Sequence, residues 1–243
     1  MPATVIDPYR GETEHEMDML GRYIAASETG LVHVREEDKL ILDEQASKIK
    51  GDFLEAAGPF IAHAYAFHQE FPMIMRYSHV TVIYSFVEYR LSTLCDELVT
   101  RNGHAETHRP QGFGSIKESK TFLTKVVDAK ITQWDELDEL AKLRNCIVHC
   151  NGFIDKHRAT LEIERIVRRN DGLKLSDQRR LLIEGTYVQK ISQEIRDLFT
   201  MAFKNLHFGS GFYFSRFPAE AGMIFDKRTK KVKIISPESP EPT

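Results

Sequence analysis

The chain has 243 residues, of which 42% are hydrophobic and 28% charged, and its formal net charge is −3. This length and composition fit one medium-sized globular domain, or one domain with decorations. Proteins that coat nucleic acid carry a strong basic excess, so this charge excludes binding through bulk electrostatics and leaves only a local site for RNA.

The N-terminus, the cysteines and the hydropathy together predict a cytoplasmic protein that does not enter membranes. Residues 1–8 contain no basic region leading into an apolar stretch, as a secretory signal would. Apolar runs are far shorter than the roughly 20 residues that span a bilayer. The three cysteines, Cys95, Cys146 and Cys150, form no CxxC pair. So small and odd a number favours reduced thiols over a disulfide framework.

The first 71 residues predict an N-terminal helical extension. Residues 16–26 are amphipathic and predict a short helix with flexible flanks. Between residues 37 and 67 apolar side chains recur at helical spacing, which predicts a second helix. We expect a kink in it near Gly58 and Pro59, because proline removes a backbone donor.

The clearest periodic signal follows Pro72, a residue that suits the first turn of a helix. Asn102 and Gly103 predict the end of this helix. Its apolar residues recur in steps of three and four over about seven turns, which makes one face hydrophobic: Val80, Ile83, Val87, Leu91, Leu94 and Leu98. Residues 103–114 contain glycine, histidine and a proline and predict a loop.

Two patterns typical of helix starts follow the loop. Ser115-x-x-Glu118 resembles a capping box and predicts a helix through about residue 129. Thr132-x-x-Asp135 resembles another and opens the next helix. The inward residues of that second helix lie at helical spacing: Leu137, Leu140, Leu143 and Ile147.

The segment after this helix is less clearly patterned. Residues 161–167 fit either a helix or a strand, and residues 180–184 fit a short strand. Thr186-x-x-Gln189 then resembles a cap for a last helix that ends near Leu206.

Residues 207–243 predict a C-terminal hairpin and a disordered tail. Two strand-like segments, 223–225 and 231–235, are joined by a basic turn. From Ser236 onward the chain is too polar and too rich in proline to pack.

The sharpest local pattern ends the helix that begins near Asp135, and it reads Arg144-Asn145-Cys146-Ile147-Val148-His149. At 100° per residue, Asn145 and His149 lie on one face, one turn apart. Arg144 lies roughly 140° from His149 on a regular helix. The two converge only if the last turn loosens, or if a second copy of the helix packs antiparallel across a two-fold axis.

This pattern resembles the Rx4–6H motif of HEPN (higher eukaryotes and prokaryotes nucleotide-binding) domains. In that family a polar residue, often Asn, commonly follows the Arg, and a glycine turn follows here at Gly152. Residues 84–91 resemble the earlier core helix of the family, which often carries an acidic residue. Residues 180–188 resemble the segment after the motif. The resemblance covers roughly residues 72–206 and implies an all-α fold, an antiparallel helical bundle, here with a short β-hairpin near the C-terminus.

The resemblance implies a metal-independent endoribonuclease that needs no cofactor and cuts RNA through the ribose 2′-OH. His149 is then the group that transfers protons near neutral pH. Arg144 offers a planar fork that matches phosphate oxygens in the transition state. Asn145 either hydrogen-bonds the phosphate or orients His149. Glu88 either holds Arg144 or sets the tautomer of His149. Many prokaryotic members act as toxins or anti-phage effectors.

The resemblance also implies partners. RNA is the substrate, and the motifs of two subunits commonly line one cleft, so a homodimer is expected. A second His149 from the partner would relieve a single histidine of acting as both acid and base. An antitoxin or another regulatory protein is a further possible partner. In the branch silenced by a nucleotidyltransferase the motif usually continues His-x-Tyr, whereas Asn151 stands here, which argues against that branch.

Other interpretations remain open. The domain could bind a nucleotide, RNA or a protein without cutting, or it could be a helical scaffold in which Arg144 and His149 are incidental. Cys146 and Cys150 beside His149 suggest zinc, but a structural zinc site needs about four ligands, so buried thiols are favoured. The aromatic residues of the long helix favour packing over base stacking: Tyr77, Tyr84, Phe86 and Tyr89. The histidines at 104, 108 and 157 are scattered in loops.

Overall fold

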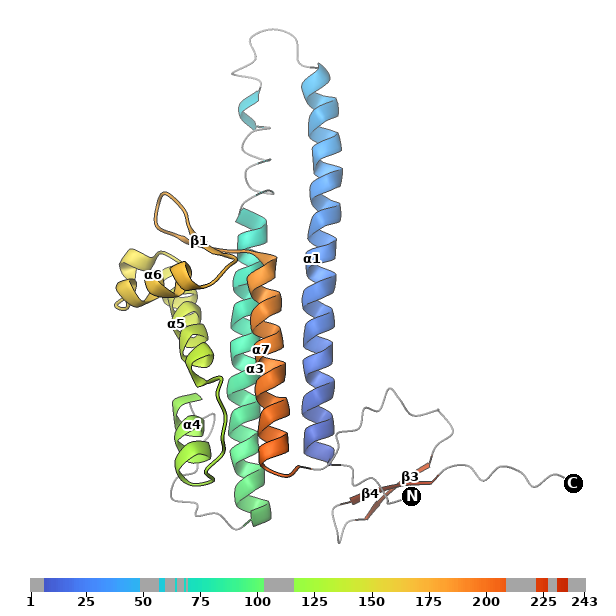
Figure 1. Cartoon of the computed structure of the whole chain (residues 1–243). Helices are drawn as coiled ribbons and strands as arrows, with labels where there is room; N and C mark the ends of the chain where they lie inside the picture. The colour runs from blue at the N-terminus through green and yellow to red at the C-terminus, as the bar shows by residue number, and fades with distance from the viewer. Residues whose placement is uncertain are drawn as a thin grey trace, which may run out of the picture.

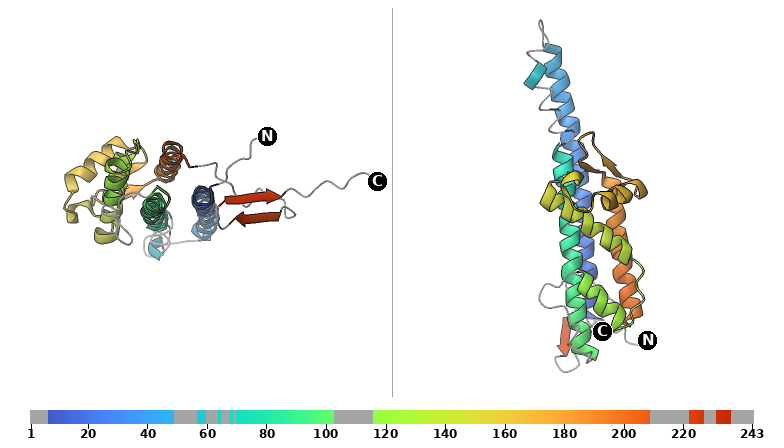
Figure 2. Two further views of the ribbon diagram at one scale, coloured as in Figure 1. Left: turned by 90° about the horizontal axis from the view of Figure 1, so that it is seen from below. Right: turned by 90° about the vertical axis from the view of Figure 1, so that its left-hand side faces the viewer.

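Three long helices form the framework of the molecule in the computed structural model, which describes residues 7–48, 57–59, 64, 68, 70–102, 116–208, 222–226 and 231–235. They are α1 (Pro8–Lys48), α3 (Phe71–Asn102) and α7 (Gly185–Asn205), and they run side by side (Figures 1 and 2). The predicted all-α fold is confirmed.

Three shorter helices lie on the side of α3 that faces away from α1 (Figure 2). They are α4 (Ile116–Lys125), α5 (Trp134–Cys150) and α6 (Thr160–Arg169), and a 3-10 turn, Ile154–Lys156, joins α5 to α6. Residues 161–167, which fitted a helix or a strand, are helical. Within the described part of the chain, none of the helices is both long enough and apolar enough to cross a bilayer.

Two small antiparallel hairpins complete the described structure. β1 (Leu173–Leu175) pairs with β2 (Leu181–Ile183), so that Leu173 lies opposite Ile183. β3 (Gly222–Asp226) pairs with β4 (Lys231–Ile235). The predicted C-terminal hairpin and the predicted strand near residue 182 are therefore present, whereas β1 was not anticipated. The predicted turn at 227–230, the loop at 103–114 and the tail from Ser236 lie outside the described residues.

The N-terminal region differs from the prediction of two helices. α1 is one helix of 41 residues, because no proline interrupts it after its first position and its buried residues continue along one narrow seam. The seam contains Tyr9, Thr13, Met17, Ile24 and Leu31. The kink expected near Gly58 and Pro59 is not tested, because residues 49–56 and 60–63 lie outside the described residues.

Charged side chains attach α1 to α3. The Arg90 side chain is only 2% exposed, and its Nε donates to Glu16 Oε2 at 2.8 Å. The Tyr9 hydroxyl donates to the backbone carbonyl of Arg90 at 2.6 Å. Further along α3, Arg76 donates to both carboxylate oxygens of Glu28, at 2.9 and 2.8 Å. A buried guanidinium is tolerated only when it is paired in this way, so α1 belongs to the same packed core as α3 and α7.

Two expected helix caps are wrong. α5 begins at Trp134 after Gln133, and no side chain caps it; the Thr132 hydroxyl lies 3.8 Å from the sulfur of Met201 instead. α7 begins at Gly185, so Thr186 lies inside the helix and cannot cap it. Ser115 lies outside the described residues.

His79 on α3 is a buried imidazole in the interface with α1. It has no exposed surface, and neither ring nitrogen has a hydrogen-bond partner among the described residues. The ring of Tyr23 meets it edge-on at 5.4 Å. Burial lowers the pKa of His79, Glu28 raises it and Arg76 lowers it. The net shift is downward, so His79 is neutral at pH 7.

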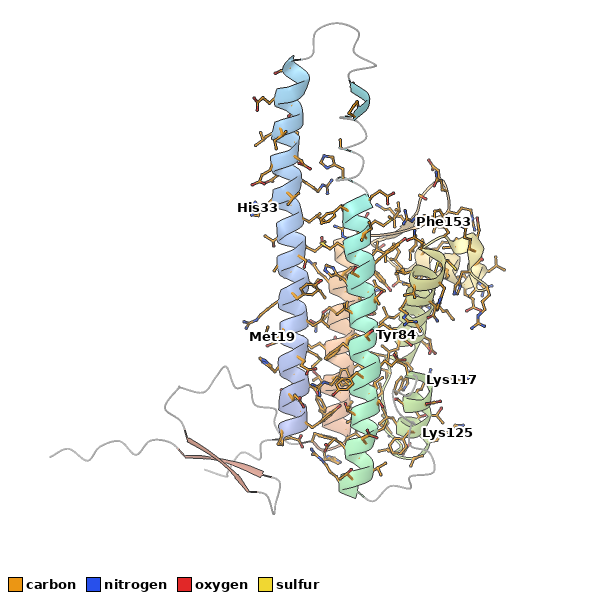
Figure 3. The ribbon with its side chains drawn as sticks, turned by 180° about the vertical axis from the view of Figure 1, so that it is seen from behind. Met19, His33, Tyr84, Lys117, Lys125 and Phe153 are labelled. Carbon is orange, nitrogen blue, oxygen red and sulfur yellow. The ribbon has the colours of Figure 1, made fainter. Side chains whose placement is uncertain are left out.

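We expect the stability of the fold to depend on pH through His79. The folded pKa lies below the unfolded value of about 6.5, so this contribution is complete above that pH and is lost as the pH falls below it. The thermal unfolding midpoint should decrease when the pH is lowered from 7.5 to 5. His79→Leu should reduce that fall, whereas His33→Leu at an exposed position of α1 (Figure 3) should not. Equal pH dependence in all three proteins would contradict the assignment.

Candidate functional site

α5 carries the Arg144–His149 pattern, and its buried face is the predicted one. Leu137, Leu140, Leu143 and Ile147 all point into the core. The helix stays regular to Cys150, and Asn151 then ends it in the left-handed conformation with φ 50°. The last turn is therefore not loosened, and Arg144 and His149 keep the divergence of a regular helix.

Arg144 and Asn145 lie where α5 faces α3. The Arg144 guanidinium carbon lies 5.1 Å from the centre of the Tyr84 ring, which Figure 3 shows on the side of α3 toward α5. Arg144 Nη1 donates to Asn145 Oδ1 at 2.9 Å. The buried Arg144 Nε has no hydrogen-bond partner among the described residues. Tyr84 and Asn145 thus hold the guanidinium in place while leaving donors unused.

Glu88 joins this cluster through Tyr84. The Tyr84 hydroxyl donates to Glu88 Oε1 at a long 3.4 Å. Burial raises the pKa of Tyr84, the Glu88 carboxylate raises it further, and Arg144 opposes the shift. Tyr84 is therefore a neutral donor at physiological pH. Tyr84 contacts both Glu88 and Arg144, and no ion pair joins these two among the described residues.

His149 lies apart from this cluster. It is exposed, and in the described structure no hydrogen bond or ion pair links it to Arg144 or to Glu88. Its electrostatic neighbour is His157, just after the 3-10 turn: partial burial lowers the pKa of His157, and Arg158 and His149 lower it further. The structure thus gathers Arg144, Asn145 and Glu88 and leaves His149 on the side toward α6.

The turn that ends α5 is held by close packing. Gly152 has φ 78°, and a Cβ atom there would lie 1.9 Å from the Tyr77 hydroxyl oxygen. That hydroxyl donates to the carbonyl of Leu181. Arg180 donates to the backbone and the side-chain oxygen of Asn151, both at 3.0 Å. Residues at the start of β2 therefore lock the end of the motif helix against α3.

We expect Gly152→Ala to lower the free energy of unfolding by at least about 1 kcal/mol, because the residue has a positive φ and the new methyl group collides with Tyr77. Urea unfolding measures the change. Gly30→Ala on α1 is the matched control, because a Cβ atom at this position lies more than 4 Å from every atom of the described structure apart from its chain neighbours and the adjacent helix backbone. It should raise stability by roughly 0.5–1 kcal/mol. A neutral Gly152→Ala would show that the turn is not constrained as described.

A shallow groove of about 390 Å³ runs between α3 and the end of α5. Apolar and small side chains dominate its lining, which consists of Ile74, Tyr77, Ser78, Thr81, Val82, Ile147 and Asn151. Ile74, Ser78 and Val82 of this lining are exposed and uncharged and belong to one face of α3.

Two residues of the site were missed by sequence reasoning. Tyr84 was interpreted as packing, but it joins Arg144 to Glu88. Its position one turn before Glu88 on the same helix face was an available signal. His157 was interpreted as a scattered loop residue. Its return toward His149 depends on the left-handed turn at Asn151 and Gly152, of which the sequence analysis indicated only the glycine turn at Gly152.

The cysteines and the possible metal ligands near the motif form no metal site in the described structure. Among the residues that the structure describes, no group of three or more His, Cys, Asp or Glu side chains is arranged to hold a metal ion. Cys146 is fully buried, and burial, with a smaller effect of Cys150, raises its pKa to about 12. Cys146 is therefore a protonated core thiol at neutral pH.

Comparison of the chain with protein-family models, curated proteins and solved structures finds no match. The resemblance to HEPN domains therefore rests on the sequence motif and its sequence context alone.

Proposed function

We propose that this protein is a metal-independent endoribonuclease of the HEPN type. The observation that carries the proposal is the Arg144 guanidinium, which is held on Tyr84 and by Asn145 five residues before His149 on the same helix, and whose Nε has no hydrogen-bond partner among the described residues. A fixed cation with free donors suits the extra negative charge on a phosphate in its transition state. A cytoplasmic toxin or anti-phage effector, held in check by a regulatory protein, is the biological role that fits such an activity.

The proposed reaction needs only the chain and its RNA. The ribose 2′-oxygen loses its proton to a base and attacks the adjacent phosphorus, which forms the new P–O2′ bond. The P–O5′ bond breaks, and the leaving 5′-oxygen takes up a proton from an acid. An imidazole near its neutral point can serve in either step, and His149 is the exposed imidazole of the motif.

We further propose that the complete site is shared by two copies of the chain. Within one chain, Arg144 and His149 lie on different edges of α5, so one phosphate does not reach both easily. The face of α3 beside the motif offers a surface for a second copy, because it is exposed and uncharged over several turns. Its residues are Ile74, Ser78, Val82, Ser85 and Tyr89, and Val148 on α5 extends it.

RNA should be cut in the presence of EDTA, and Arg144→Ala and His149→Ala should each slow the cut by at least about 100-fold. His33→Ala removes an exposed histidine from α1 (Figure 3) and serves as the control, with unchanged cleavage expected. Gel analysis of a labelled RNA measures the rates, and circular dichroism checks the fold of each variant. A requirement for a divalent metal, or full activity of His149→Ala, would refute the proposal.

Mixing the two inactive variants tests the shared site. If Arg144 and His149 act on one phosphate from different chains, an equimolar mixture of Arg144→Ala and His149→Ala forms heterodimers with one intact site. Random exchange should restore about a quarter of the wild-type sites. Cleavage assays of the mixture after subunit exchange measure this recovery. Absence of recovery in a mixture shown to form dimers would place both residues of a working site in one chain.

The separation of Arg144 from His149 also favours a second candidate, a module that binds a nucleotide, RNA or a protein without cutting. In that case Arg144 would hold phosphate, and His149 would have no role in proton transfer. Binding by the folded wild-type protein that Arg144→Ala weakens, with no cleavage of RNA in any buffer, would favour this module over the nuclease.

A further inference from the structure

The segment from the C-terminal half of α5 through α6, which includes the motif, is much more basic than the rest of the chain. Residues 142–169 contain seven Lys and Arg against three Asp and Glu, a formal charge of +4 in a chain whose total is −3. This segment folds back on itself, because the turn at Asn151 and Gly152 brings the 3-10 turn and α6 against the end of α5 (Figure 1). The excess charge is therefore concentrated in space around His149.

The three acidic residues of this region all form ion pairs, and none of these pairs involves Arg158 or Arg165. Glu164 binds Arg168 at 3.0 Å and also Arg179. Asp155 binds Arg179 at 2.7 Å. Glu162 on α6 pairs with Lys142 on α5 at 2.7 Å.

Arg158 and Arg165 are both exposed, and neither has an ion-pair partner in the part of the chain that the structure describes. Arg158 directly follows His157 in the chain, and Arg165 lies one turn after Glu162 on α6. Arg158 contributes to the lowered pKa of His157, and Arg165 to that of Glu162. Lys142 and His149 are seven residues apart and so share one face of α5. The ion pair from Lys142 to Glu162 shows that this face borders the start of α6. His149, His157, Arg158 and Arg165 thus lie on one surface.

His157 adds a donor with a defined orientation. Its Nδ1 accepts a hydrogen bond from the backbone N–H of Ala159 at 3.1 Å. The neutral ring must then carry its proton on Nε2. A ring held in this tautomer offers an N–H to an anion instead of a lone pair to a proton. His157 is therefore suited to bind a phosphate oxygen and is poorly suited to act as a base.

We propose that Arg158, Arg165 and the Nε2–H of His157 form a binding surface for the phosphate groups of single-stranded RNA beside His149. The identity of the polymer rests on the proposed ribonuclease function; the anion site rests on the unpaired cations and the oriented donor. Arginine forks suit phosphate oxygens, and the exposed Leu161 between the two arginines, 67% accessible, offers an apolar contact for a ribose or base. The surface would guide the strand across His149.

Fluorescence anisotropy of a labelled single-stranded RNA of about 16 nucleotides tests the proposal. The measurements use the full chain with His149→Ala, so that cleavage does not interfere, at several salt concentrations. The double variant Arg158→Ala/Arg165→Ala in that background should bind about 25-fold more weakly at 0.1 M salt, because each lost contact costs about fivefold. The slope of log K against log salt should become shallower by about 1.4. His157→Ala should weaken binding, and His157→Gln, which keeps an N–H donor, should recover part of it.

Lys117→Ala/Lys125→Ala in the same background is the matched control. It removes the same charge from exposed positions on α4, away from α6 (Figures 1 and 3). This control should retain the affinity and the salt slope of the parent. Equal losses in both double variants, or no loss in Arg158→Ala/Arg165→Ala, would overturn the surface even if the wild type cuts RNA. Selective loss of binding in a protein that never cuts RNA would support the surface and reject the nuclease.

Discussion

The contact between Tyr77 on α3 and Gly152 after α5 is the constraint on which the site depends. The backbone of Gly152 passes so close to the tyrosine that no side chain fits, and the same hydroxyl binds the start of β2. Because α3 and α5 run antiparallel, this contact also sets their register. Seven residues further along α3 and eight residues back along α5, Tyr84 meets Arg144. The two distances along the helices, about 10.5 and 12 Å, are nearly equal.

The same register explains why Arg144 and His149, the two ends of the motif, face different parts of the molecule. A regular α5 that buries Leu143, Cys146 and Ile147 must turn Arg144 toward α3 and His149 toward α6. Arg144 then enters a partly buried setting with an aromatic ring and an amide, whereas His149 remains exposed. A helix packed in this way offers a fixed guanidinium and a separate, accessible imidazole. Any chemistry that needs both groups on one phosphate requires a second surface, and the uncharged face of α3 is the available one.

Periodicity predicted the parts of the fold whose residues bury one clear face. The stripe from Val80 to Leu98 and the leucines of α5 lie where the spacing placed them. Local cap patterns failed at Thr132 and Thr186, because tertiary packing decides at which residue these helices start. The length of α1 was underestimated, since beyond Met17 its buried seam has only one residue every seven, Ile24 and Leu31.

The site was predictable as a motif but not as a set of contacts. Arg144, Asn145 and His149 follow from sequence alone, as does a role for an acidic residue on the long helix. That Arg144 meets Tyr84 and does not touch Glu88 depends on the α3–α5 register, which no spacing within one helix contains. The approach of His157 to His149 likewise depends on how far the left-handed turn rotates the chain.

Net charge was the least informative sequence feature, for a physical reason. A total of −3 argues against nucleic-acid binding only if the charges are evenly spread. Here the acidic residues near the motif are used in ion pairs: Arg179 alone engages both Asp155 and Glu164. Arg158 and Arg165 are left without an ion-pair partner among the described residues. An approaching phosphate would therefore meet these two unpaired arginines. The pattern of ion pairs, and not the net charge, decides whether an acidic protein can present a surface that binds RNA.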